Sequence, residues 1–145
     1  ETGPKPDGST EALEISRKTS PFFSRWVEQQ VHDLAEARAA ITDRHFSRLA
    51  EIAEHNCLKM HSIMWASRPP MVYWNAATMR CLQTIRQLQG KGVDVFFTID
   101  AGPQVKAVCL PDAVVEVATA LRATAGVTEL MTTGLGAGAR LETGA

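Results

Sequence analysis

The side chain best placed to do chemistry in this sequence is the carboxylate of Asp100. It ends the apolar, β-branched and aromatic run at residues 93–99, whose alternation predicts a strand with Asp100 on the face opposite the main apolar row. Gly102 has no Cβ, so a ligand could approach the backbone there, and Pro103 stiffens the exit from the turn. A carboxylate on such a rigid rim can accept a proton or stabilise positive charge. The alternative is a turn aspartate that accepts local backbone hydrogen bonds or pairs with Lys106.

A second group of reactive side-chain types lies at His55, Cys57 and His61. On a helix, Cys57 and His61 are four residues apart and share a face, whereas His55 points elsewhere. A zinc site needs more ligands than this pair supplies. We therefore expect no metal site here, and interpret the group as a packed thiol with partly exposed histidines.

Two further patterns have a simple structural interpretation beside a functional one. The glycine-rich run at residues 134–138 could cradle a phosphate through its backbone amides, but it lacks the Lys-Ser/Thr of a P-loop, so a flexible tail is favoured. Methionines with flexible side chains fill irregular gaps in cores. We expect that role, rather than a ligand-binding one, for Met60, Met64, Met71 and Met79.

The elements that must position Asp100 follow from hydrophobic spacing and turn residues. The strand at 93–99 is joined by residues 100–103 to a second strand, up to Leu110. Ser20 and Pro21 are interpreted as the cap and first residue of a helix that ends near residue 41. Apolar residues at helical spacing predict further helices over residues 46–64, roughly 73–89, and from 111 to about 121. Short strands are predicted at residues 11–17 and 127–132.

Length and composition predict one ordinary globular domain. The 145 residues include 45% hydrophobic and 21% charged side chains, enough for a sizeable core. A net charge of -1 gives no reason to expect nucleic acid or a membrane surface as a partner. No apolar run approaches the roughly 20 residues of a membrane span, and the polar start shows no signal peptide. The odd set Cys57, Cys81 and Cys109 predicts buried free thiols, a reducing compartment and hence a cytoplasmic location.

The residues around Asp100 also carry a family resemblance. The sequence FFTIDAGPQVKAV, residues 96–108, resembles the aspartate loop of the diphosphomevalonate decarboxylases, members of the GHMP small-molecule kinase superfamily. Their pattern is aromatic-T-x-D-A-G-P-N-x-K/A, and Gln104 keeps the amide of the usual Asn. Other matches lie in the family's order over nearly the whole chain, although Ala12 and Leu13 replace the usual Gly-Met. These matches are Gly8-Ser9-Thr10, Thr19-Ser20, Trp26, Asp33, Phe46, Glu54, Asn56, Met60-His61 and residues 70–73.

The resemblance implies an α+β fold, an antiparallel sheet covered by helices, like the C-terminal domain of GHMP kinases. Residues 1–145 would form a single domain, the C-terminal, substrate-side half of a two-domain enzyme whose N-terminal ATP-binding half is absent from this chain. The implied function is ATP-dependent decarboxylation of mevalonate 5-diphosphate to isopentenyl diphosphate in isoprenoid biosynthesis. ATP and Mg²⁺ would be bound mainly by the absent half, so we expect this fragment alone to be inactive.

The resemblance also assigns roles to individual residues. Asp100 would be catalytic, accepting or orienting the proton of the substrate's tertiary hydroxyl. The backbone amides of Ala101 and Gly102 would bind the substrate's carboxylate or phosphates. Ser9 and Thr10 would be further substrate contacts, through hydroxyl or backbone donors. Asn56 and His61 would belong to the helix that supports the cleft.

Partners and alternatives complete the expectations. The implied partners are the substrate mevalonate diphosphate, the chain's own N-terminal domain, and a second copy in a homodimer. Phe22, Phe23 and Trp26 cluster at one helix start, and we expect part of this apolar material to meet another domain or subunit, with ordinary core packing as the alternative. Phosphomevalonate decarboxylase and mevalonate 3-kinase remain open as sister activities. A non-catalytic docking domain is an alternative of another class, against which the intact Asp-Ala-Gly-Pro sequence argues.

Overall fold

The computed structural model describes residues 8–141, apart from the side chain of Ser9. The helices and strands in chain order are α1 (Ser9–Thr19), α2 (Phe23–Thr42), α3 (Phe46–Trp65), α4 (Ala76–Gly90), β1 (Val95–Thr98), β2 (Lys106–Cys109), the 3₁₀ helix η1 (Pro111–Ala113) and α5 (Val114–Arg122). This confirms the predicted α+β class, with helices covering a small antiparallel sheet.

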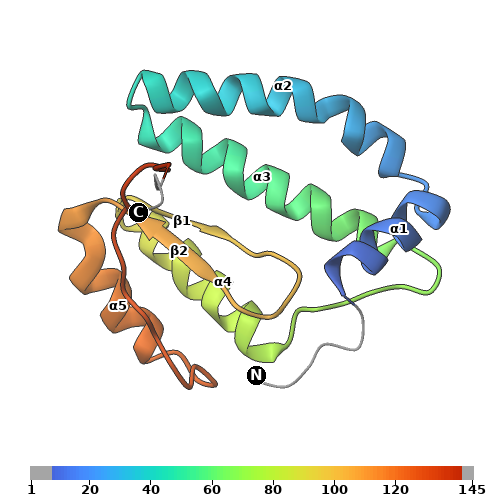
Figure 1. The fold of residues 1–145 in the computed structure, drawn as a ribbon. Helices are drawn as coiled ribbons and strands as arrows, with labels where there is room; N and C mark the ends of the chain where they lie inside the picture. The colour runs from blue at the N-terminus through green and yellow to red at the C-terminus, as the bar shows by residue number, and fades with distance from the viewer. Residues whose placement is uncertain (1–7, 142–145) are drawn as a thin grey trace.

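The two strands form the centre of the arrangement in Figure 1. They pair antiparallel, with Val95 opposite Cys109 and Thr98 opposite Lys106. Helices α3 and α4 both contact β1, α5 packs against α4 and β2, and α2 lies along α3 on the side away from the sheet. Helix α1 contacts α2 and α3. The loop that follows β1 is therefore held between long helices.

The main core lies between β1, α4 and α5. The predicted row of alternate residues is buried there: Val95 is 2% exposed, Phe97 1% and Ile99 0%. Ile85 on α4 and Leu121 on α5 complete this cluster. A slip by one residue would remove this whole row from the core between β1, α4 and α5, so its burial fixes the register of the strand.

A second, smaller core joins α1 to the end of α3. It is formed by Ala12, Ile63, Met64 and Met71, with Met60 packed against it. These contacts confirm the interpretation of three of the four methionines as core filler. Met79 is the exception, because its side chain is 46% exposed on α4.

The expected strand at residues 11–17 is wrong, since this segment lies inside α1. Leu13 and Ile15 suggested alternation, but the buried positions are Ala12, Ser16 and Ser20, whose spacing of four is helical. The hydroxyl of Ser16 donates to the carbonyl oxygen of Ala12 at 2.9 Å. The four-residue spacing of small buried side chains therefore indicates the structure of this segment better than the apolar alternation does.

The predicted start of α2 is also wrong by two residues. Ser20 is the C-cap of α1, where its N–H donates to the carbonyl of Ser16, and Phe22 is the N-cap of α2. The C-terminal end of α2 and both ends of α3 agree with expectation to within one residue, and α5 begins three residues late because residues 111–113 form η1. Helix α4 begins three residues later than predicted because Asn75 and Thr78 form a capping box.

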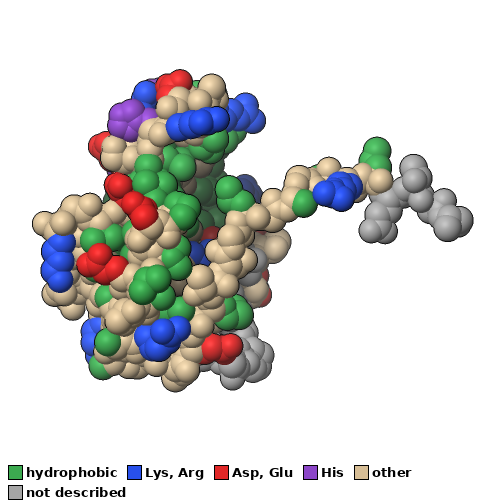
Figure 2. Space-filling model, turned by 90° about the vertical axis from the view of Figure 1, so that its left-hand side faces the viewer, with side chains coloured by type: hydrophobic (Ala, Val, Ile, Leu, Met, Phe, Trp, Pro, Cys, Tyr) green, Lys and Arg blue, Asp and Glu red, His purple; other side chains and the backbone are tan. Residues whose placement is uncertain are grey.

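The predicted strand at residues 127–132 is absent, because the described sheet contains only β1 and β2. Val127 and Leu130 nevertheless pack against the main core. Their apolar spacing reflects this packing rather than strand pairing. The residues beyond them, 131–141, are exposed, and the segment leading to the C-terminus projects from the body in Figure 2.

No helix among residues 8–141 is long and apolar enough to cross a membrane. The three cysteines are free, as predicted: Cys57 and Cys81 are buried and Cys109 is partly exposed. Burial raises the pKa of all three thiols above the ordinary value.

Candidate active site

Asp100 lies two residues after the end of β1, in the loop formed by residues 99–105. Its side chain is 74% exposed and forms an ion pair with Lys106, the first residue of β2. The ion pair with Lys106, which was part of the alternative interpretation of Asp100 as a turn residue, is therefore present. An exposed pair of this kind contributes little to stability, so it does not lock the carboxylate in place.

The far side of the loop is fastened to α4. The hydroxyl of Thr78 donates to the carbonyl oxygen of Pro103 at 2.9 Å, and Asn75 accepts a hydrogen bond from the N–H of Thr78 at 2.9 Å. Ala101 and Gly102 are buried beneath this connection. The cap of α4 thus serves two purposes, because it starts the helix and holds the loop that carries Asp100.

The near side of the loop is held by α3. Cys57 and His61 share one face of that helix and converge on the backbone of Ile99, the residue before Asp100. The Sγ of Cys57 lies 3.3 Å from the nitrogen of Ile99, and the Nε2 of His61 lies 3.0 Å from its carbonyl oxygen. Burial lowers the pKa of His61, against the opposing effects of this hydrogen bond and the charge of Asp100.

Ser9 and Thr10, the other predicted contacts, begin α1. Gly8 is the N-cap of this helix and offers no side-chain cap, while Thr10 is exposed. In Figure 1 the first turn of α1 lies at the same end of the molecule as the β1–β2 loop. The structure thus holds Asp100, Ala101 and Gly102 in one loop, whereas Thr10 lies on α1.

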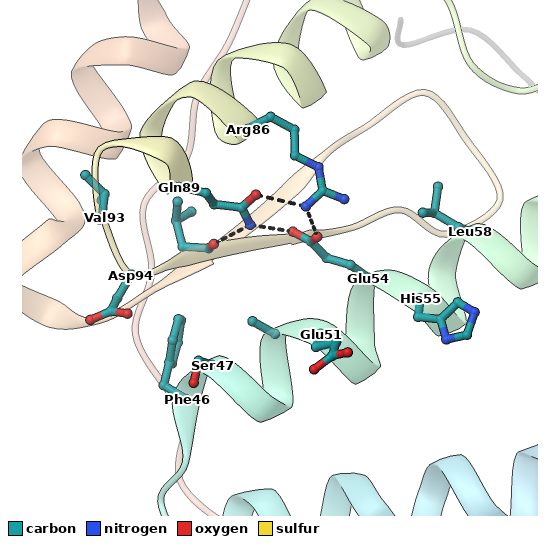
Figure 3. Close-up of a pocket in the computed structure, with 13 residues that line it drawn as sticks. Phe46, Ser47, Glu51, Glu54, His55, Leu58, Arg86, Gln89, Val93 and Asp94 are labelled. Atoms are coloured by element: carbon teal, nitrogen blue, oxygen red, sulfur yellow. Dashed lines mark hydrogen bonds and ion pairs between the residues drawn. The ribbon is translucent and has the colours of Figure 1, made fainter.

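The sequence did not predict that the carboxylate of Glu54 is buried and bonded to side chains and backbone of two other elements (Figure 3). Glu54 is 7% exposed, and Arg86 Nη1 lies 2.6 Å from its Oε2. Its Oε1 accepts hydrogen bonds from Gln89 Nε2 at 2.8 Å and from the N–H of Phe97 at 3.2 Å. The guanidinium of Arg86 also lies 5.3 Å from the ring centroid of Phe97. One carboxylate therefore ties α3, α4 and β1 together.

This network forms one wall of an open cavity of about 490 Å³. Phe46, Leu58 and Val93 supply apolar lining, and Glu51 and Asp94 bring negative charge. Hydrophobic and acidic side chains also lie next to one another on the face shown in Figure 2. The lining does not include Asp100, so in this chain the predicted catalytic residue lies outside the cavity.

Helices α2 and α3 are joined by a polar contact at Asp33. Its carboxylate accepts a hydrogen bond from Asn56 Nδ2 at 2.8 Å and pairs with Lys59. Burial alone would raise the pKa of Asp33, but these two partners hold it below the ordinary value. Asn56 thus supports the helix that carries Cys57 and His61 through a contact with α2, a role that the sequence left open.

Residues 1–139 match the family described as "Mevalonate 5-diphosphate decarboxylase C-terminal domain". The chain belongs to this family. The diphosphomevalonate decarboxylase of Bos taurus is 27% identical over 121 residues, which are 81% of this chain and 30% of that protein. The diphosphomevalonate decarboxylase of Candida albicans is 27% identical over 96 residues, 66% of this chain and 26% of that protein.

Solved decarboxylase structures share the fold of this domain. Mevalonate diphosphate decarboxylase from Staphylococcus aureus is 32% identical, with a TM-score of 0.79 over 84% of this chain and 37% of that one. A structure described as MDDEF in complex with MVAPP is 31% identical, with a TM-score of 0.80 over 87% of this chain and 40% of that one. The chain thus spans less than half the length of these relatives.

Two parts of the site were missed by reasoning from the sequence. Cys57 and His61 were interpreted as a packed thiol and a partly exposed histidine rather than as a metal site. The thiol is packed, but the exposure expected for His61 is wrong, because its ring is fully buried and both side chains bond the backbone of Ile99. In the described part of the chain, no group of three or more His, Cys, Asp or Glu side chains is placed to hold a metal. The contact of Thr78 with Pro103 had no signal in the sequence, because it joins residues 25 apart.

Proposed function

We propose that this chain is the C-terminal, substrate-side part of an ATP-dependent mevalonate diphosphate decarboxylase. The observation that carries the proposal is the intact Asp100-Ala101-Gly102-Pro103 loop, held from both sides in a domain of the decarboxylase family. The substrate named for the related MDDEF structure, MVAPP, favours the diphosphate over the monophosphate or unphosphorylated sister substrates.

The proposed chemistry assigns Asp100 two duties. ATP transfers its terminal phosphoryl group to the tertiary hydroxyl of the substrate, whose proton Asp100 accepts or orients. The C–O bond to that phosphate and the bond to the carboxyl carbon then break, releasing phosphate and carbon dioxide and leaving the alkene. Asp100 stabilises the positive charge that develops at the tertiary carbon as phosphate departs. The N–H groups of Ala101 and Gly102 are the proposed donors to the substrate's anionic groups, with Ser9 and Thr10 as further contacts.

The structural neighbour described as containing MVAPP, AMPPCP and magnesium supports ATP and Mg²⁺ as requirements of the complete enzyme. Among the described residues there is no group of three or more His, Cys, Asp or Glu side chains that could hold a metal by itself, although Mg²⁺ bound with a nucleotide needs only one or two carboxylates beside the phosphates. From the family resemblance, we place ATP and its Mg²⁺ mainly on the N-terminal half, outside this chain. The predicted cytoplasmic location stays a prediction.

Carbon dioxide release tests this function. The full-length protein is expected to release carbon dioxide from mevalonate 5-diphosphate only with ATP and Mg²⁺, whereas the isolated 145-residue chain folds and releases none. The measurement is trapping of labelled carbon dioxide, with mevalonate 5-phosphate and mevalonate as matched substrates. Carbon dioxide release mainly from mevalonate 5-phosphate would assign the sister decarboxylase activity, and ADP formation with mevalonate but without carbon dioxide would assign the 3-kinase activity. Turnover by the isolated chain would contradict the placement of ATP on the N-terminal half. A folded full-length protein that forms neither carbon dioxide nor ADP would favour a docking domain.

The homodimer is proposed to form through an apolar stripe on α2, made of Val27, Val31, Leu34 and Ile41. Val31 is 79% exposed, Leu34 53% and Ile41 60%, although the sequence pattern suggested a face turned to the core. With Arg38 the stripe follows the alternating spacing of four and three typical of a coiled-coil seam. This spacing favours a helix of a second copy as the partner.

At the start of α2, Phe22 is 56% exposed, whereas Phe23 and Trp26 are partly buried against each other. This partial exposure leaves the predicted contact with another domain or subunit open.

Val31→Glu is expected to convert the full-length dimer to a monomer, because it places a charge in the seam. Sedimentation velocity measures the mass, and His32→Glu, one residue away and off the stripe, is the matched control. A Val31→Glu protein that stays dimeric would rule out this surface.

A further inference from the structure

The backbone at Ile99 lies just beyond the end of the strand ladder. The last pair of the sheet is Thr98 with Lys106, so β2 does not pair with Ile99. Both polar groups of Ile99 are bonded instead by side chains of α3. The Sγ of Cys57 accepts from the N–H, and the carbonyl oxygen accepts from the Nε2 of His61 at 3.0 Å and from the Sγ of Cys57 at 3.6 Å. Because Ile99 is fully buried, water does not replace these partners.

These contacts act on two successive peptide planes. The carbonyl of Ile99 belongs to the planar unit that also contains the nitrogen and Cα of Asp100. A hydrogen bond to that oxygen therefore fixes the atoms from which the Asp100 side chain projects. The N–H of Ile99, bonded to Cys57, belongs to the preceding unit. Among the described residues, the Asp100 carboxylate, which is 74% exposed, pairs with the exposed Lys106, and such a pair restrains it only weakly.

The contact with the Ile99 carbonyl determines which tautomer of the His61 ring is present. A carbonyl oxygen can only accept, so the Nε2 of His61 must carry the hydrogen. The imidazole is fully buried, with its ring centroid 4.8 Å from that of Trp74. Its burial favours the neutral ring by lowering the pKa. His61 is therefore a fixed donor aimed at one carbonyl, with its other nitrogen free of described partners.

We propose that His61, assisted by Cys57, is a positioning residue for Asp100, setting the direction in which the catalytic carboxylate leaves β1. The proposal deepens the proposed decarboxylase function and rests on it. A displacement of about 1 Å at a reacting group can cost roughly a hundredfold in rate. Loss of the Nε2 donor should thus lower turnover while leaving substrate binding, which other residues provide, almost unchanged.

The test compares three single variants of the full-length enzyme. His61→Leu removes the donor at similar volume, His61→Gln keeps an N–H near the Nε2 position, and His55→Leu is the control on the exposed part of the same helix. We expect kcat to fall about 10- to 100-fold in His61→Leu, with KM within about threefold. His61→Gln is expected to recover most of the activity, and His55→Leu to keep all of it.

Two further measurements separate positioning from a purely structural role. In an Asp100→Asn background, His61→Leu should cause no additional fall in kcat, because it acts only through that carboxylate. A fall as large as in the wild type, or unchanged kcat in His61→Leu alone, would overturn the proposal. If His61→Leu does not fold, the proposal is decided by His61→Gln and Cys57→Ala: near-normal kcat in Cys57→Ala, or no recovery in a folded His61→Gln, would overturn it.

Nitrogen NMR of the wild-type enzyme tests the contact without relying on activity. We expect a neutral His61 with its proton on Nε2 at pH 7, and the Nδ1–H form or a charged ring would overturn the assignment. A wild type that shows the Nε2–H form but releases no carbon dioxide would overturn the decarboxylase function, and the positioning role with it. An active wild type in which His61→Leu behaves normally would overturn the positioning role alone.

Discussion

Replacing Asp100 by Asn in the full-length enzyme is expected to lower kcat at least about a thousandfold. Loss of a positioned general base alone costs roughly 10²–10⁴ in rate, and loss of charge stabilisation at the tertiary carbon adds to it. The change is nearly isosteric and its site is exposed, so folding should survive. KM should change far less, as expected for an interaction made mainly in the transition state. Steady-state assays and a melting curve of the same preparation measure both effects.

The matched control is Asp94→Asn, an exposed carboxylate just before the same strand. Its kcat should stay within about threefold of the wild type. If Asp100 were only a turn residue paired with Lys106, Asp100→Asn would alter the melting temperature slightly and leave kcat within about tenfold. That result would refute the catalytic assignment while leaving the family membership intact.

Replacing Glu54 by Leu is expected to reduce the free energy of unfolding by about 2–3 kcal/mol. Removing one partner from a buried ion pair costs roughly 3–5 kcal/mol, and this figure is reduced here because Arg86 is 54% exposed and water can solvate it. The remaining loss comes from Gln89 and from the N–H of Phe97, a buried donor left without its acceptor. Urea unfolding followed by tryptophan fluorescence measures the change.

Two comparisons make this expectation specific to the network. Glu54→Gln keeps an oxygen for the N–H of Phe97 and should cost only about 1 kcal/mol. Glu51→Leu alters an exposed carboxylate one turn earlier on α3 and should change the unfolding free energy by less than about 0.5 kcal/mol. Equal effects of Glu51→Leu and Glu54→Leu would show that the buried contacts do not carry the stability.

The division between an exposed carboxylate and buried supports has a functional meaning. Under the proposed function, Asp100 reaches a substrate that is also held by a part of the enzyme outside this chain, which agrees with its exposed position on this domain. The strand and loop are held from the interior of the domain by Glu54, His61 and Thr78, where solvent does not compete for their hydrogen bonds. Mutations in these supports are therefore expected to alter turnover through Asp100 rather than through direct contact with substrate.

The sequence by itself determined the features that depend on neighbours along the chain. Alternation over residues 93–99 predicted β1 and its buried row, and the Asp-Ala-Gly-Pro motif predicted the loop and its family. Helical spacing predicted α3 and most of α2, α4 and α5. These predictions succeeded because strand and helix periods are local properties of the backbone.

Tertiary structure decided the features that depend on which partner is available. Residues 127–132 have strand-like composition but no strand beside them, so they pack as irregular chain. The apolar stripe of α2 faces solvent because α3 contacts a different side of that helix. Cys57 and His61 bond Ile99 across separations of 42 and 38 residues, which no local pattern specifies. The backbone before Asp100 is thus held by a meeting of α3 with β1 that only the folded chain creates.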